Sequence, residues 1–409
     1  MPRMSTTAPG GSTVVRLRRL TMVPEEDGVM VGRPDIASYA LFPEAGAELL
    51  RMLHAGTPLP EGVEWYEQAC GEELDVADFL DALDGLGFLL ADGEDEPEPG
   101  AVRWQRLGRW VFSWPAWVAY AAVTVAGVAA MVDRPELRPS YRNVFFTQYL
   151  ALIPVGLLGT AIAGILLHEA SHALAGRRLG LPSRLGIGRR LYYVVAETRL
   201  DALLSVPRRR RYLPFLAGML TDTVVCASLT LLAWALDRPG VPPWCHRLCL
   251  AVAFSCVLRL IWQFMFYLQT DLYFVVATLM RCQDLQAATK FLVRSRIRRV
   301  LRREAPRPEA DEMEWSERDQ AMARWYAPVL VAGYGFSLAS LAWAGIPTMW
   351  RFWSTAVRRF TTAGTPVGSR IDAALFAAMA AFEIGVLVHV TLRDRRARAR
   401  TPRPEGATA

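Results

Sequence analysis

GTAIAGILLHEASHALAGRRLG, residues Gly159–Gly180, places two histidines and a glutamate inside a long apolar run. His168 and His172 are four residues apart, so both imidazoles lie on one face of a helix and can bind one metal ion. Glu169 follows the first histidine, where it can act as a general base and then as a general acid. The spacing predicts a catalytic zinc site inside a membrane helix.

The position of these residues in the run supports a buried site. Nine residues at about 1.5 Å each place His168 roughly 13 Å below the boundary that Arg177 marks. Ionisable groups at that depth cost on the order of 2.5–3.5 kcal/mol each, and a metal ion compensates for this cost. The alternative is an interfacial helix whose His and Glu side chains are solvated.

Apolar residues gather in six runs, each near or above the roughly 20 residues that a helix needs to cross a bilayer. Inside hydrocarbon the backbone must satisfy its own hydrogen bonds, so the runs predict helices. The fold class expected is mainly α, a polytopic helical membrane protein with about six transmembrane helices and a small N-terminal α+β winged-helix-like domain. The run 244–280 exceeds one straight span and is expected to be tilted, broken near Gln269 or partly interfacial. The six runs are 109–131, 148–176, 212–236, 244–280, 327–348 and 371–392.

Charge is divided unevenly along the 409 residues. Residues 1–100 hold 20 acidic and 6 basic side chains, whereas arginine dominates 177–211, 281–326 and the tail after Arg393. Basic loops face the cytoplasm, and alternation across six spans then places both termini there. Lys290 is the one lysine among 46 basic side chains, a bias typical of a GC-rich bacterium. The expected location is therefore a bacterial cell membrane, in a multi-pass arrangement, and no signal peptide is expected.

The first 91 residues predict a disordered tail over 1–12 and a folded domain over 13–91. Two β-prone runs, 13–20 and 28–32, are separated by a turn signal at Glu25–Gly28 and predict a hairpin. Three helices are expected from Pro43 to His54, from Pro60 to about Cys70, and from Asp75 to Gly87. The remaining segments are an acidic linker over 92–108, a membrane metalloprotease core over 109–281, a basic cytosolic loop over 282–326, a transmembrane pair over 327–392 and a basic tail over 393–409.

Zinc needs a third protein ligand, and the apolar runs contain two candidate carboxylates, Asp222 and Asp271. Asp271 lies ten residues before Arg281, about 15 Å from the cytosolic boundary if the helix is continuous, which matches the depth of His168. Asp271 is therefore the predicted ligand. The alternative is a carboxylate that caps a helix at a break in the long run.

Three motifs within residues 148–281 resemble the site-2 protease family of intramembrane zinc metalloproteases. The first is the HExxH helix, and the others read Ala217-Gly218-Met219-Leu220-Thr221-Asp222 and Asp271-Leu272-Tyr273. The resemblance implies supporting roles beside the reaction centre for Gly218 and Asp222. Asp222 replaces the family's asparagine, Met219 its proline, and Leu272 the glycine after the ligand.

The segments EEDGVMVGRPDIASYALFPEAGAELLRML and GEELDVADFLDALDGLGFLL resemble the peptide-recognition domain of PqqD-like proteins. That family binds leader segments of ribosomally made, modified peptides as an added strand. The alternative is a winged-helix domain that only docks on the membrane part. Nucleic acid is disfavoured as a partner, because so acidic a domain repels phosphate. The resemblance implies peptide contacts at Ser38, Tyr39, Leu41, Asp78 and Phe79.

RLGIGRRLYYVVAETRL, residues 184–200, is β-prone from Leu191 to Val195. A membrane-dipping strand there could pair with an extended substrate, as the sheet of the site-2 protease family does. An arginine-rich amphipathic loop that binds anionic lipid is the alternative.

Together the motifs predict a zinc metallopeptidase in the lipid bilayer that cleaves a modified-peptide precursor captured by the N-terminal domain. Glu169 is the predicted catalytic residue, and zinc is the predicted cofactor, bound by His168, His172 and Asp271. One alternative is a non-hydrolytic peptide-binding membrane protein for export or self-protection. Another is a site-2 protease that acts on a membrane-anchored regulator. A transporter is disfavoured, because the spans show no internal repeat.

Overall fold

The computed structural model describes residues 6–7, 13–26, 28–91, 94, 100–147, 152–191, 193–282, 284–301, 315–362 and 364–400. Most of the predicted tail 1–12, most of the acidic stretch 92–100 and the end of the basic tail, 401–409, lie outside these residues. The chain divides into two compact units. The first comprises 1–111, 173–184 and 199–214, and the second comprises 112–172, 185–198 and 215–409.

The first unit contains a three-stranded antiparallel sheet in the order β3–β4–β5. Its strands are β3 (Thr21–Glu25), β4 (Gly28–Arg33) and β5 (Ser38–Phe42). The predicted turn joins β3 to β4, and Glu25 pairs with Gly28 across it. The prediction of 13–20 as the first hairpin strand is wrong. Only Thr13–Val14 (β2) is a strand there, paired with Thr6–Thr7 (β1), and Leu17 bridges Leu89. A tight turn selects the residues that directly precede it as the partner strand, whatever the β propensity of an earlier run.

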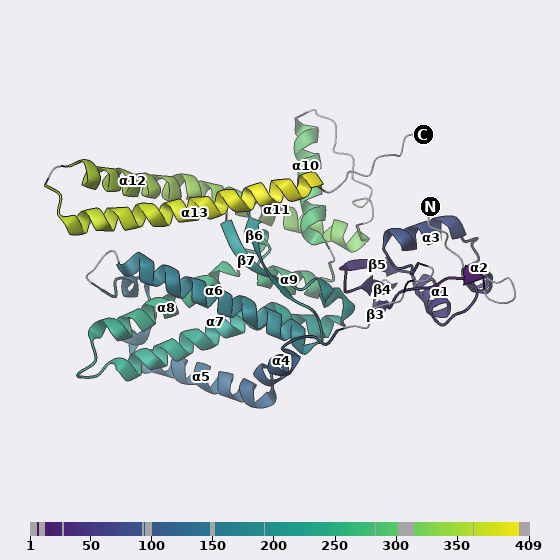
Figure 1. Cartoon of the computed structure of the whole chain (residues 1–409), viewed down its shortest axis with the longest axis horizontal. Coiled ribbons are helices and arrows are strands. Elements are labelled where there is room, and N and C mark those ends of the chain that lie inside the picture. The colour runs from purple at the N-terminus through teal and green to yellow at the C-terminus, as the bar shows by residue number, and fades with distance from the viewer. Residues whose placement is uncertain are drawn as a thin grey trace. The chain divides into compact units, whose positions relative to one another are not determined.

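Three helices accompany this sheet as predicted: α1 (Glu44–His54), α2 (Leu59–Cys70) and α3 (Val76–Gly85) (Figure 1). The Asp75 carboxylate caps α3 by accepting hydrogen bonds from the backbone of Ala77 and Asp78. Gly87 then adopts φ +69°, which ends the helical segment. The core of this α+β domain is a cluster of fully buried apolar side chains: Val31, Leu49, Leu50, Leu53, Leu83 and Phe88.

A buried carboxylate links the β3–β4 turn to the cytosolic end predicted for a span. Glu25 accepts a hydrogen bond from Arg211 at 2.8 Å and pairs with Arg208 at 2.5 Å. Both arginines belong to the first turn of α7 (Arg208–Leu236), and the Glu25 side chain is 5 % exposed. The first unit therefore includes the beginning of a membrane helix as well as the N-terminal domain.

Six helices in the described part of the chain are long and apolar enough to cross a membrane, which confirms the predicted fold class. Two of these helices, α5 and α7, approach closely, because a Cβ at Gly127 would lie 2.7 Å from Ala227. In Figure 1 the last span runs antiparallel to α12 (Ile346–Thr361), the helix that continues the fifth span. The six are α5 (Trp114–Asp133), α6 (Leu152–Arg178), α7, α8 (Pro243–Trp262), α11 (Glu317–Ser340) and α13 (Val367–Arg400).

Several predicted connections are helical instead. α4 (Gln105–Val111) begins inside the predicted linker, and α10 (Leu285–Val300) fills much of the predicted loop 282–326. α11 begins at Glu317 and continues through a π-helical turn, Leu341–Gly345, into α12 (Ile346–Thr361). Span prediction from hydropathy misses these segments, because a polar or basic helix can be stabilised by packing on a neighbour, as α10 is by α11.

The long run 244–280 is broken near Gln269, one of the arrangements expected for it. α8 ends at Trp262, a 3-10 turn (Phe266–Leu268) follows, and Gln269 has φ +54°. A left-handed residue cannot continue an α-helix. A new helix, α9 (Asp271–Leu279), therefore begins inside the apolar run with an aspartate in its first turn.

The segment between α6 and α7 is a β-hairpin; a strand, one of the two alternatives left open for 191–195, is present there, together with a second strand that was not predicted. Its strands are β6 (Arg184–Arg190) and β7 (Tyr193–Arg199). Leu191, predicted to lie in the strand, stands at the turn with φ +57°. Leu191 and Tyr193 pack against Tyr267, Leu268 and Leu330, so hydrophobic contacts anchor the hairpin tip to the helices of the second unit.

Candidate metal centre

Helix α6 presents the two predicted histidines side by side. The ring centroids of His168 and His172 are 4.9 Å apart, and both side chains are buried. One helical turn separates them, so each ring projects from the same face toward α7 and α9. The predicted pairing of these imidazoles is confirmed.

Asp271 reaches both histidines from a different helix. Its Oδ2 atom lies 3.1 Å from Nε2 of His168 and 3.2 Å from Nε2 of His172. Ligands of a tetrahedral zinc ion with bonds of 2.0–2.1 Å stand about 3.3 Å apart. Both distances from Oδ2 match that spacing, and Asp271 faces the rings rather than capping a helix with its side chain.

The end of α8 holds Asp271 in place. The hydroxyl of Thr270 donates to the backbone carbonyl of Gln263 at 2.7 Å, and the Gln263 side-chain oxygen accepts from the backbone N–H of Asp271 at 3.0 Å. Gln263 and Thr270 are both buried, so these hydrogen bonds are protected from water. The helix break thus orients the Asp271 carboxylate through these two hydrogen bonds.

Gly218 on α7 makes room for the two rings. A Cβ atom at this position would lie 2.3 Å from Nε2 of His168 and 2.5 Å from Nε2 of His172. Such distances are far inside van der Waals contact, so only glycine fits. The predicted supporting role of Gly218 therefore has a concrete basis, the close approach of one helix to the ring nitrogens of another.

Glu169 lies beside the histidines and is held by a hydroxyl of the hairpin. Thr198 Oγ1 is 2.8 Å from both the carboxylate Oε2 and the backbone carbonyl of Glu169. Ligand atoms of His168, Glu169 and His172 lie within 4.8 Å of one another, and all three residues are buried. This group could hold a metal ion.

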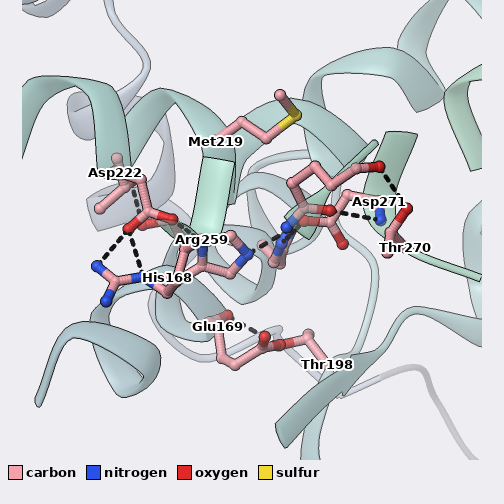
Figure 2. Close-up of polar contacts among 12 residues, drawn as sticks. His168, Glu169, Thr198, Met219, Asp222, Arg259, Thr270 and Asp271 are labelled. Carbon is pink, nitrogen blue, oxygen red and sulfur yellow. Dashed lines mark hydrogen bonds and ion pairs between the residues drawn. The ribbon is translucent and has the colours of Figure 1, made fainter. Parts of the chain in front are cut away.

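Asp222 occupies the opposite side of His168 from Asp271 (Figure 2). Its Oδ2 is 2.8 Å from Nδ1 of His168, and its Oδ1 accepts from Nε and Nη2 of Arg259 at 3.0 and 2.7 Å. A carboxylate at Nδ1 keeps the proton on that nitrogen and leaves the lone pair of Nε2 for a metal. Asp222 is therefore next to the candidate ligand set without belonging to it.

The charges around the histidines favour a divalent cation. Glu169, Asp222 and Asp271 contribute three carboxylates, and Arg259 contributes one guanidinium. Two negative charges are left in excess in a largely buried region, where uncompensated charge is costly. Histidine and carboxylate donors fit zinc or another divalent transition metal.

No family model, curated protein or solved structure matches this chain. Function must therefore be inferred from the site itself.

Four site residues were not predicted from the sequence: Thr198, Arg259, Gln263 and Thr270. A signal for Arg259 was present, because it is an ionisable residue in an apolar run, as Asp222 is. Thr198, Gln263 and Thr270 are uncharged and carried no such signal. They are recognised only from their hydrogen bonds.

The predicted peptide contacts lie in the first unit. Ser38, Tyr39 and Leu41 are on β5, an edge strand of its sheet, and the Tyr39 ring covers Gly32 on β4. On α3, Asp78 is exposed, whereas Phe79 packs against the domain core. An edge strand has unpaired backbone groups that can accept another strand.

Proposed function

We propose that this chain is an intramembrane zinc metalloprotease in which His168, His172 and Asp271 hold the metal and Glu169 is the catalytic acid–base. One observation carries the proposal. Nitrogen atoms from α6, a helix apolar enough to cross a bilayer, and an oxygen atom from α9 converge at 3.1 and 3.2 Å. We further propose a bacterial cell membrane with both termini in the cytoplasm, as the arginine distribution indicates.

Asp271 is a better third ligand than Glu169. The Asp271 carboxylate contacts both Nε2 atoms, whereas Oε2 of Glu169 is bound by the Thr198 hydroxyl. A carboxylate held beside the ligands, but not among them, suits proton transfer. The division of roles gives two histidines and one aspartate to the metal and leaves Glu169 free for chemistry.

Zinc held there supplies Lewis acidity toward a peptide carbonyl and an attacking water. Glu169 would remove a proton from that water as the water oxygen forms a bond to the carbonyl carbon. The same carboxyl group then gives the proton to the peptide nitrogen as the C–N bond breaks. Thr198, by holding Oε2 at 2.8 Å, orients the other carboxylate oxygen for both transfers.

The substrate proposed is the precursor of a ribosomally made, modified peptide. β7 ends beside Glu169, so an extended peptide paired with the β6–β7 hairpin would run toward the site. The β5 edge and α3 would bind the leader. A membrane-anchored regulator is the alternative substrate, and a non-hydrolytic peptide-binding protein is the alternative function.

The deciding experiment uses the full chain in detergent or vesicles, with any short precursor peptide found to be encoded beside its gene. Glu169→Gln is expected to retain about one metal ion per chain and to lose cleavage by at least about 10³-fold. His172→Ala is expected to lose both. Glu61→Gln, at an exposed position on α2 in the first unit, serves as the control.

Each contrary outcome has a distinct meaning. Continued cleavage by Glu169→Gln would overturn the mechanism. A wild-type protein that binds metal and precursor but cleaves neither precursor nor membrane regulator would support the non-hydrolytic alternative. Cleavage of a regulator that survives deletion of residues 1–100 would favour the regulator over the leader-bearing precursor.

A further inference from the structure

Arg259 is a charged side chain inside an apolar helix, and its contacts are specific. Nε and Nη2 both donate to Oδ1 of Asp222, and Nη2 also approaches Sγ of Cys256 at 3.2 Å. Asp222 is 1 % exposed. A buried ion pair of this kind contributes little net stability compared with apolar packing, which calls for another reason for its presence.

Space for the guanidinium is provided by α6 itself. A Cβ at Gly164 would lie 2.9 Å from both Nη1 and Nη2 of Arg259. Gly164 precedes His168 on α6 by one helical turn. The guanidinium of Arg259, which comes from α8, therefore packs against α6 one turn before His168. Three helices, α6, α7 and α8, thus meet at one chain of polar contacts.

The direction of hydrogen bonding along this chain is fixed by chemistry. A guanidinium can only donate, so Asp222 must accept through Oδ1. The remaining carboxylate oxygen, Oδ2, lies 2.8 Å from Nδ1 of His168 and can only accept when ionised. Nδ1 must then carry the proton, so a metal ion shared with His172 and Asp271 would take the lone pair of Nε2.

We propose that Arg259 and Asp222 form one positioning unit that sets the tautomer and orientation of His168 for metal binding. This inference rests on the proposed zinc site and adds a residue to it. Arg259 also explains how an aspartate can stand where the site-2 protease motif has asparagine. Its positive charge balances the additional carboxylate, so the histidine keeps an acceptor at Nδ1 without another net charge in the membrane.

The unit makes a specific prediction for single and double variants. In Asp222→Asn, Arg259 still donates to the side-chain oxygen, so the NH₂ group faces Nδ1 of His168. The NH₂ group can only donate, so it favours the tautomer whose proton is on Nε2, where the metal would bind. Adding Arg259→Met frees the amide to turn its oxygen toward Nδ1. The double variant should therefore bind metal more tightly than Asp222→Asn alone, a non-additive result that two independent residues would not give.

The test measures Zn²⁺ and Co²⁺ dissociation constants by chelator competition, the visible absorption spectrum of bound Co²⁺, and the thermal unfolding of the metal-free protein. Arg259→Met should weaken metal binding about 10- to 100-fold and change the Co²⁺ spectrum. Arg259→Lys keeps the charge, so the unfolding temperature of the metal-free protein should stay near wild type. Metal binding should still be weakened. Arg247→Met, an exposed arginine on α8, is the matched control.

The outcomes separate this inference from the proposed function. If wild-type protein binds no divalent metal, the proposed function fails, and the positioning role fails with it. If wild-type protein binds metal and both Arg259 variants bind it with unchanged affinity and an unchanged Co²⁺ spectrum, only the positioning role is overturned. Failure of the double variant to improve on Asp222→Asn would likewise overturn it.

Discussion

Oδ2 of Asp271 lies 3.1 Å from Nε2 of His168, although 103 positions separate the two residues in the chain. The contact depends on the interruption of one apolar run, which begins α9 at Asp271. An acidic residue in the first turn of a helix is favoured by the helix dipole. The break therefore both stabilises the carboxylate and directs it to the histidines.

Asp271→Asn should weaken zinc binding by at least about 100-fold. The change keeps the size of the side chain but removes the charge that completes a two-histidine, one-carboxylate donor set. Metal content after dialysis against a weak chelator measures the effect. Asp237→Asn, at the exposed end of α7, should leave it unchanged, and equal retention by both variants would contradict a ligand role for Asp271.

Gly218→Ala should abolish metal binding although it adds only one methyl group. The new Cβ would stand 2.3 Å from Nε2 of His168, so the ring must leave the position that faces Asp271. Gly159→Ala on α6 meets no atom within 4 Å and serves as the matched control. Calorimetric titration with zinc should show binding in the control and none in Gly218→Ala.

Thr198→Val should lower kcat by about 10- to 100-fold while KM and metal content stay near wild type. Valine has the shape of threonine but cannot donate to Oε2 of Glu169, so the proton-transferring carboxylate loses its orientation. Thr198→Ser should restore most of the rate. A KM effect without a kcat effect would instead assign Thr198 to substrate binding.

Lys290 should react with acylating reagents at lower pH than an ordinary lysine. Burial on α10, together with the nearby positive charges of Arg294 and Arg190, lowers its pKa below 10.5. The neutral amine is the reactive form, so the pH midpoint of labelling moves down with the pKa. Arg294→Gln removes one like charge and should move the midpoint up. Mass spectrometry of the single lysine peptide at graded pH gives both midpoints, and identical values would contradict this arrangement.

Glu25→Gln should destabilise the first unit far more than Glu48→Gln. Glu25 is buried between Arg208 and Arg211, and removing one partner of a buried pair costs about 3–5 kcal/mol. Glu48 forms an exposed pair with Arg51, worth about 0–1 kcal/mol. Chemical unfolding, followed by a probe in the N-terminal domain, gives the free energy of unfolding of both variants. Similar losses in this free energy would show that Glu25 does not form a buried ion pair with Arg208 and Arg211.

The sequence alone determined the helical membrane class, the six spans, the three N-terminal helices and the pairing of His168 with His172. These features follow from local rules, namely run length, 3.6-residue periodicity and capping at Asp75. Asp271 was selected from the sequence by matching depths along two helices. In the structure its carboxylate lies beside both histidines, and α9 runs from Asp271 to Leu279.

Other features were decided by the tertiary structure. The hairpin register at Thr21–Glu25, the helix over 285–300 and the roles of Thr198, Gln263 and Arg259 depend on partners distant in the chain. A hydroxyl or an amide has the same local pattern whether it faces solvent or a buried carboxylate. Only the packing of α6, α7, α8 and α9 fixes which hydrogen bonds those groups make, and thus which of them surround the candidate metal centre.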